Sequence, residues 1–393
     1  MTSPETLGAI LLWTSALLLF AHAGGWLAER ARQPAVLGEL LAGVAAGALF
    51  TVDRRAEPAL DLLASLGVIF LLFEVGLESS LEKLKAVGPR AAMVAVVGVA
   101  VPVAMGYAVL RIFDHDASLL TSLFIGATLA ATSVGITARV LRDLGRENSL
   151  EARVVLGAAV VDDVLGLLLL SFLVAGARGV GSVRDTAMLG VQATAFLAVS
   201  VMVLPSLLLR LPWPAGPVPG IVFCLLMGWA ADRVGLAPIV GAFAAGLAIS
   251  SARKSGPASD AGAAAPWDET SHDPIPLRAS LRGLAAVLAP LFFVEMGRRV
   301  DLRAAMSGGA PRLLLALIAV AVLGKIVAGV AAPKGTRLAV GLGMIPRGEV
   351  GLIFAGLGRS LGLVDAATTS TLVLVVLATT LIGPPALRWR LKA

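Results

Sequence analysis

Two adjacent carboxylates, Asp162 and Asp163, lie in the middle of an apolar run of helical length, residues 154–170. A lysine, Lys325, lies in the middle of another such run, residues 313–330. A charged side chain at the centre of a lipid bilayer costs roughly 2.5–3.5 kcal/mol on insertion scales. We therefore expect these three groups to pair with one another, to face water, or to bind a cation or a proton.

The rest of the chain is typical of a helical membrane protein that crosses the bilayer many times. Hydrophobic residues make up 58% and charged residues 15% of the 393 residues, whereas soluble proteins carry about 25% charged residues. The apolar residues fall in runs of about 20, the length that crosses the hydrocarbon core as a helix. The sequence therefore predicts an all-α polytopic membrane protein.

We expect about thirteen membrane-spanning helices. The basic residues gather in short loops, so the net charge of +6 indicates membrane orientation, and we expect no nucleic-acid partner. Cytoplasmic loops are enriched in Lys and Arg, which predicts a cytoplasmic C-terminus and an N-terminus outside. The loop at residues 298–303 is an exception, because its arginines fall outside. The expected spans are residues 6–27, 34–51, 59–79, 88–111, 119–144, 150–177, 182–209, 217–233, 236–251, 278–298, 311–332, 336–359 and 364–387.

The chain contains two related halves. VLGELLAGVAAG around Gly38 resembles IVGAFAAGLAIS around Gly241, and LGVIFLLFEVG ending at Gly76 resembles LAPLFFVEMG ending at Gly297. We expect each copy to hold six spans, with one extra span between them, so that the copies have opposite orientations. Inverted repeats are typical of secondary transporters, whose substrate site lies between the repeats near the membrane midplane.

One span in each half is interrupted by residues that do not favour a helix in lipid. The interruptions are residues 131–135 (ATSVG) and 344–349 (MIPRGE). Paired interruptions of this kind indicate a transporter site, although Thr and Ser alone would equally suit close helix packing. The candidate cation oxygens here are Thr132 and Ser133, and the charges that can offset stranded helix dipoles are Lys325, Arg347 and Glu349.

The paired carboxylates suit ion exchange. Neighbouring residues lie about 100° apart around a helix, so one of Asp162 and Asp163 can face Lys325 while the other faces an aqueous cavity. Removal from water disfavours the charged form of a carboxylate and of an amine, so both can exchange protons near physiological pH. A small hard cation such as Na⁺ competes with the proton for the same oxygens. Exposing one such site alternately to the two sides is sufficient for cation/proton exchange.

Four motifs together resemble the NapA/NhaA-like monovalent cation:proton antiporters of the Kef-type branch. They are ATSVGITARVL, GAAVVDDVLGL, LGKIVAG and GMIPRGEVGLI, and the resemblance covers almost the whole chain. It implies that Asp163 is the main cation and proton carboxylate and that Asp162 pairs with Lys325 when no ion is bound. It also implies electrogenic exchange of Na⁺ or Li⁺ for protons, without a cofactor, by a homodimer in the lipid of the cell inner membrane.

The resemblance further implies two discontinuous crossing helices and a core domain that moves against a scaffold domain. The expected parts are scaffold helices at residues 6–79 and 217–298, a flexible cytoplasmic linker at 252–276, core transport helices at 88–177 and 311–387, and a linking helix at 182–209.

Two glutamates depart from this pattern. Glu74 and Glu295 occupy equivalent repeat positions, each two residues before a glycine. We expect each to be solvated or salt-bridged near a membrane surface, with Arg298 and Arg299 close to Glu295. The alternative is a gating pair at the two cavity mouths.

Other functions stay open at this point. The oxygens named above do not separate Na⁺ from K⁺, so a K⁺/H⁺ exchanger or a Kef-like K⁺ efflux protein without a regulatory domain is the main alternative. An intramembrane aspartyl protease is a remote one, because it needs aspartates on two facing helices and commonly a GxGD motif. We expect a transporter and not an enzyme.

Overall fold

A computed structural model of the chain describes residues 4–31, 33–78, 88–146, 149–177, 188, 191–192, 195–196, 198–200, 202–210, 217–255 and 277–392. The regular elements in these ranges are all helices, which agrees with the predicted all-α class. Six of the helices there are long and apolar enough to cross a membrane.

The helices follow the expected spans closely. They are α1 (Pro4–Arg30), α2 (Ala35–Leu49), α3 (Glu57–Glu78), α5 (Pro89–Phe113), α6 (Leu119–Thr128), α7 (Val134–Asp143), α8 (Leu150–Ala177), α10 (Leu204–Arg210), α11 (Pro217–Arg233), α12 (Pro238–Ser255), α13 (Leu277–Arg298), α14 (Leu302–Ala305), α15 (Ala310–Ala328), the 3₁₀ helix η2 (Gly329–Ala331), α16 (Arg337–Gly343), α17 (Glu349–Ser360) and α18 (Ala366–Lys392).

The ends of two helices differ from the sequence-based expectation. Helix α12 continues to Ser255, so the first residues of the expected linker at 252–276 are helical. Helix α18 continues past residue 387 to Lys392, where cationic side chains stabilise the negative end of the helix dipole. Residues 256–276, and most of the span expected at 182–209, lie outside the described residues.

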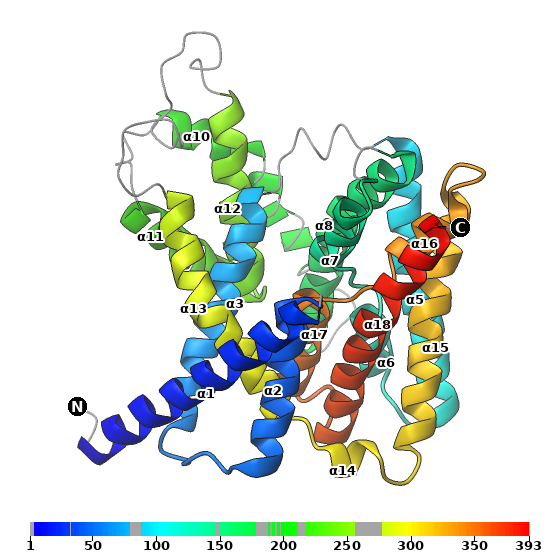
Figure 1. Ribbon diagram of the computed structural model, residues 1–393. Helices are drawn as coiled ribbons and strands as arrows, with labels where there is room; N and C mark the ends of the chain where they lie inside the picture. Colours follow the sequence, from blue (N-terminus) through cyan, green and yellow to red (C-terminus); the bar gives the residue numbers. More distant parts are fainter. Residues whose placement is uncertain are drawn as a thin grey trace.

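The helices form two groups that lie side by side (Figure 1). One group contains α1, α2, α3, α11, α12 and α13, and the other contains α5 to α8 and α15 to α18. Apolar clusters join them, and in one of these Leu40 of α2 and Phe293 of α13 pack together with Leu129 and Leu352 of the second group. The contact between the two groups is therefore formed in large part by apolar side chains.

Within the first group, helices approach each other at glycines. A Cβ atom added to Gly24 of α1 would overlap the carbonyl oxygen of Gly38 on α2, and one added to Gly43 of α2 would overlap the carbonyl oxygen of Val294 on α13. Small residues let membrane helices approach until their backbones touch. Inside lipid there is no hydrophobic driving force for helix association, so this close van der Waals packing holds the helices together. These glycines therefore set the spacing of α1, α2 and α13.

An ion-pair network lies at the C-terminal end of α13. Glu295 is buried and accepts hydrogen bonds of 2.8 Å from Nε of Arg298 and from Nε of Arg299. Arg299 also pairs with Asp61 of α3. The salt-bridged interpretation of Glu295 is therefore correct, and Glu74 is half-buried on α3.

We predict that Gly24→Ala separates α1 from α2 and lowers stability by about 1–3 kcal/mol, the usual cost of overfilling a packed contact. Gly8→Ala on the same helix is the matched control, because a Cβ there meets no atom within 4 Å. Thermal unfolding of the purified variants in detergent checks this. Equal melting temperatures for the two variants would show that the Gly24 contact does not limit packing.

Candidate ion-binding site

Two helices of the second group are interrupted where the sequence predicts. Helix α6 ends at Thr128 and α7 begins at Val134, while α16 ends at Gly343 and α17 begins at Glu349. In the second interruption, Pro346 has no backbone N–H to continue a helix and disfavours helical geometry in the residue before it. Gly348, at φ −132° and ψ −143°, completes the departure from helical geometry.

The two interruptions contact each other. The backbone N–H of Ser133 donates to the carbonyl oxygen of Pro346 over 2.8 Å, and the Thr132 hydroxyl donates to the carbonyl oxygen of Met344 over 3.4 Å. A Cβ atom on Gly348 would lie 2.8 Å from Oγ of Ser133, so the glycine makes room for this serine. Backbone groups that leave a helix inside a membrane need partners, and here each interruption supplies partners for the other.

A buried ion pair lies beside these interruptions. Nζ of Lys325 on α15 lies 3.3 Å from Oδ1 and 3.4 Å from Oδ2 of Asp162 on α8. Lys325 is 0% exposed and Asp162 is 3% exposed. Helix α5 packs against both α8 and α15, and a Cβ atom on its Gly98 would lie 3.5 Å from Nζ of Lys325. The pair therefore lies inside the second group, where each charge depends on the other.

Asp163 and Thr132 complete the polar cluster. Asp163 is half-buried, and its charge acts on Lys325. Thr132 interacts with the carboxylate of Asp162. The structure thus brings together Asp162, Asp163, Lys325 and Thr132. Ser133 directly follows Thr132 in the chain. Asp162 is the carboxylate that faces the lysine, and Asp163, about 100° further around the helix, is the more exposed of the two.

Arg347 is fully buried and binds backbone carbonyls around the interruptions. Its guanidinium donates to the carbonyl oxygens of Leu129 at the end of α6, Ile345, and Ala321 on α15. The end of a helix carries partial negative charge on such carbonyls, so the arginine neutralises the stranded end of α6. The side chain of Glu349, the other supporting charge expected from the sequence, lies outside the described part of the chain.

Sequence reasoning missed two threonines that hold this region. The Thr137 hydroxyl donates to the carbonyl oxygen of Gly343 over 2.6 Å, and the Thr380 hydroxyl donates to the carbonyl oxygen of Arg347. Most threonines in membrane helices bond within their own helix, as Thr379 does with Val375. Nothing in the local sequence distinguishes a threonine that bonds within its own helix from one that bonds to another segment, because the partner depends on which segment lies opposite.

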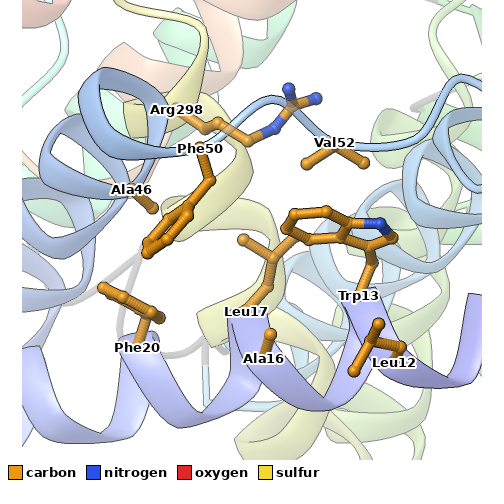
Figure 2. A pocket seen from close by; sticks show the side chains of 9 residues that line it. All are labelled: Leu12, Trp13, Ala16, Leu17, Phe20, Ala46, Phe50, Val52 and Arg298. Carbon is orange, nitrogen blue, oxygen red and sulfur yellow. The ribbon is translucent and has the colours of Figure 1, made fainter. Parts of the chain in front are cut away.

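A cavity of about 210 Å³ lies elsewhere, between α1, α2 and the end of α13 (Figure 2). Trp13, Phe20 and Phe50 line it. Arg298 lies at its rim, and its guanidinium forms an ion pair with Glu295. Apolar walls offer no oxygen ligands to a hard cation. Within the described ranges, no three His, Cys, Asp or Glu side chains gather as a metal cluster. The charged cluster around Asp162 is therefore the better candidate for binding an ion.

Comparisons with known proteins identify the family of the chain. The family model described as "Sodium/hydrogen exchanger, transmembrane" matches residues 16–393. The high-affinity Na⁺/H⁺ antiporter NhaS3 of Synechocystis is 35% identical, over 98% of this chain and 83% of its own length. The Na⁺/H⁺ antiporter of Enterococcus hirae is 32% identical, over 96% of each chain.

A solved structure shows the same fold. The sodium proton antiporter MjNhaP1 from Methanocaldococcus jannaschii at pH 8 superposes with a TM-score of 0.74, covering 97% of each chain at 15% identity. An identity this low supports the fold alone. Together with the family match over almost the whole sequence, these findings show that the chain belongs to the transmembrane sodium/hydrogen exchanger family.

Proposed function

We propose that the protein exchanges Na⁺ for protons across the membrane and that the Asp162, Asp163 and Lys325 cluster carries the exchange. The observation that carries this proposal is the buried Asp162–Lys325 pair beside two interrupted helices. Intramembrane charges of this kind mark ion pathways and proton relays. Membership of the exchanger family supports the same function, and the relatives are named as antiporters, that is, as transporters and not enzymes.

In the proposed cycle, the cation and the proton compete for the same oxygens. Asp163, the more exposed carboxylate, receives either ion from water. When Na⁺ binds, it also takes oxygens of Asp162, so the carboxylate releases Lys325. Thr132 and Ser133 supply hydroxyl oxygens, the kind of ligand a hard cation accepts. When Lys325 and Asp163 bind protons, the cation is expelled and the protonated Lys325 pairs with Asp162 again.

This cycle is electrogenic if Lys325 loses its proton when Na⁺ binds. A buried ammonium without its carboxylate is strongly disfavoured, so Lys325 releases a proton as Asp162 turns to the cation. More protons than cations then cross in each cycle, and the membrane potential contributes to the driving force.

We further propose the architecture that this cycle needs. The second helix group is the moving core, and the first group is the scaffold and the homodimer surface in the inner membrane. About thirteen spans in two inverted repeats, with an outer N-terminus and a cytoplasmic C-terminus, place both interruptions near the midplane. In this topology the α13–α14 turn and the end of α18 lie on opposite sides of the membrane, and in Figure 1 they lie at opposite ends of the bundle.

K⁺ is the second candidate cation. One relative, 31% identical over 96% of this chain, is named a Na⁺/H⁺-K⁺ antiporter, GerN of Bacillus cereus. Carboxylate and hydroxyl oxygens accept either ion, so the cluster by itself does not favour one. A protease function has no such support, because both aspartates lie on α8 and Asp162 is engaged by Lys325.

We predict that Asp163→Asn abolishes exchange and leaves a folded, membrane-inserted protein, because an amide neither holds the cation strongly nor carries a proton. Proteoliposomes with a pH-sensitive dye report exchange on addition of Na⁺, Li⁺ or K⁺. Asp116→Asn, at an exposed carboxylate in the α5–α6 loop, is the matched control and should behave as wild type. A wild-type response from Asp163→Asn would contradict the assignment.

We predict that Lys325→Ala lowers the free energy of unfolding by about 3–5 kcal/mol, since it leaves the buried Asp162 uncompensated. It should also weaken the coupling of exchange to the membrane potential. Melting temperature and voltage-dependent exchange are the two measurements. The double variant Lys325→Met with Asp162→Asn removes both charges and should regain much of the stability. Full stability of Lys325→Ala would mean that the ion pair is not structural.

We predict that a potential of 100 mV, negative inside, drives cation export with about 2.3 kcal/mol for each net charge moved. The measurement uses liposomes with equal pH and equal Na⁺ on both sides, before and after valinomycin sets a K⁺ potential. Net Na⁺ movement after valinomycin is the expected result. Exchange that ignores the potential would instead indicate an electroneutral cycle in which Lys325 keeps its proton.

A further inference from the structure

A carboxyl group outside the proposed ion site is buried in the first helix group. Glu39 lies on α2, where it is the one ionisable residue between Ala35 and Leu49. Its side chain is 8% exposed, and Oε2 has no hydrogen-bond partner among the described residues. Glu39 also takes part in no ion pair found in the described part of the chain. The exchange cycle proposed above does not use this residue.

Among the described residues, no cation compensates the charge of an ionised Glu39. A Cβ atom on Gly25 of α1 would lie 3.4 Å from its Oε1, so the carboxyl group lies against the α1 backbone. The charge on α1 that acts on Glu39 is that of Glu29, which is negative like an ionised Glu39. The guanidinium of Arg30 lies 4.0 Å from the centre of the Trp26 ring. On α13, which also packs against α2, residues 283–294 are all uncharged.

The protonation state of Glu39 therefore bears on how α1 and α2 pack. A neutral carboxyl group is tolerated in this position, whereas an ionised carboxylate without a partner is costly to bury. Glu39 directly follows Gly38, whose backbone touches that of Gly24. Separating the two helices is the simplest way for water to reach an ionised Glu39, and the close glycine contact opposes such a separation.

We propose that Glu39 is a second proton-binding residue of this protein, separate from Asp162, Asp163 and Lys325, and that proton release from it loosens the contact between α1 and α2. Leu37 and Leu40, its neighbours on α2, pack into an apolar cluster that joins the two helix groups. Loosening of α2 by alkaline pH therefore acts on the surface along which the groups meet. The inference does not rest on the proposed exchange, because it concerns packing within the first group.

The sign of the effect follows from proton linkage. A carboxyl group that binds its proton more tightly in the folded protein stabilises the fold at low pH and loses that contribution as the pH rises. We expect the melting temperature of wild type to fall by about 2–4 °C more than that of Glu39→Gln between about pH 6 and about pH 9. The quantity compared is the change in melting temperature with pH. The absolute melting temperatures are not compared, because a buried amide at position 39 destabilises the protein at every pH.

Three controls make the measurement specific. Glu29→Gln should reduce in part the fall in melting temperature that wild type shows with rising pH, because it removes the negative charge near Glu39. Glu5→Gln, at an exposed carboxylate near the other end of α1, should leave the fall unchanged. The Glu39→Gln comparison repeated in the Asp163→Asn background should give the same difference, so loss of exchange does not affect the result.

Parallel curves of melting temperature against pH for wild type and Glu39→Gln would overturn the proposal, whatever the exchange assays show. If Glu39→Gln does not accumulate in the membrane, Glu39→Met replaces it, since a long apolar side chain also abolishes the charge. A smaller fall in melting temperature with pH for Glu39→Met than for wild type supports the proposal, and equal falls again overturn it.

Discussion

The buried ion pair between Asp162 and Lys325 is the contact on which the second helix group depends. A buried carboxylate and a buried ammonium are tolerated only together. The pair joins α8 to α15, and both of these helices pack against α5. Helix α5 packs beside the lysine at Gly98, where an added Cβ atom would lie 3.5 Å from Nζ. The same dependence makes the pair suitable for transport, because an ion that takes one partner changes the state of the other.

The interrupted helices follow from a second constraint. Backbone groups inside a membrane need hydrogen-bond partners, and each interruption exposes several of them. The Ser133 N–H donates to the carbonyl oxygen of Pro346 across the gap, and Arg347 donates to the carbonyl oxygen of Leu129 at the end of α6. The cost of breaking the helices is offset by these contacts. What remains is a polar region inside an apolar bundle, with the aspartates beside it.

The contact between the two helix groups differs from the packing within them. Each group is packed backbone to backbone at glycines, such as Gly24 in the first group and Gly126 in the second, which leaves little freedom to shift. The surface between the groups is largely apolar, and apolar contacts are non-directional, so they permit small displacements without breaking hydrogen bonds. Glu39 lies on α2, which belongs to the first group and also reaches the apolar surface.

The sequence by itself determined the helical class, most helix positions and both interruptions, because hydropathy, Pro and Gly act locally along the chain. It also singled out Asp162, Asp163 and Lys325, because charge in an apolar run is visible without a fold. Only the tertiary structure decided that Arg347 binds the end of α6, that Thr137 and Thr380 bridge between elements, and that Oε2 of the buried Glu39 has no partner among the described residues. It also brings Asp162 to Lys325, the pair that the family resemblance implied. Those relations depend on how each helix is rotated against its neighbours. That rotation is set by side-chain packing between segments far apart in the chain, which no local pattern records.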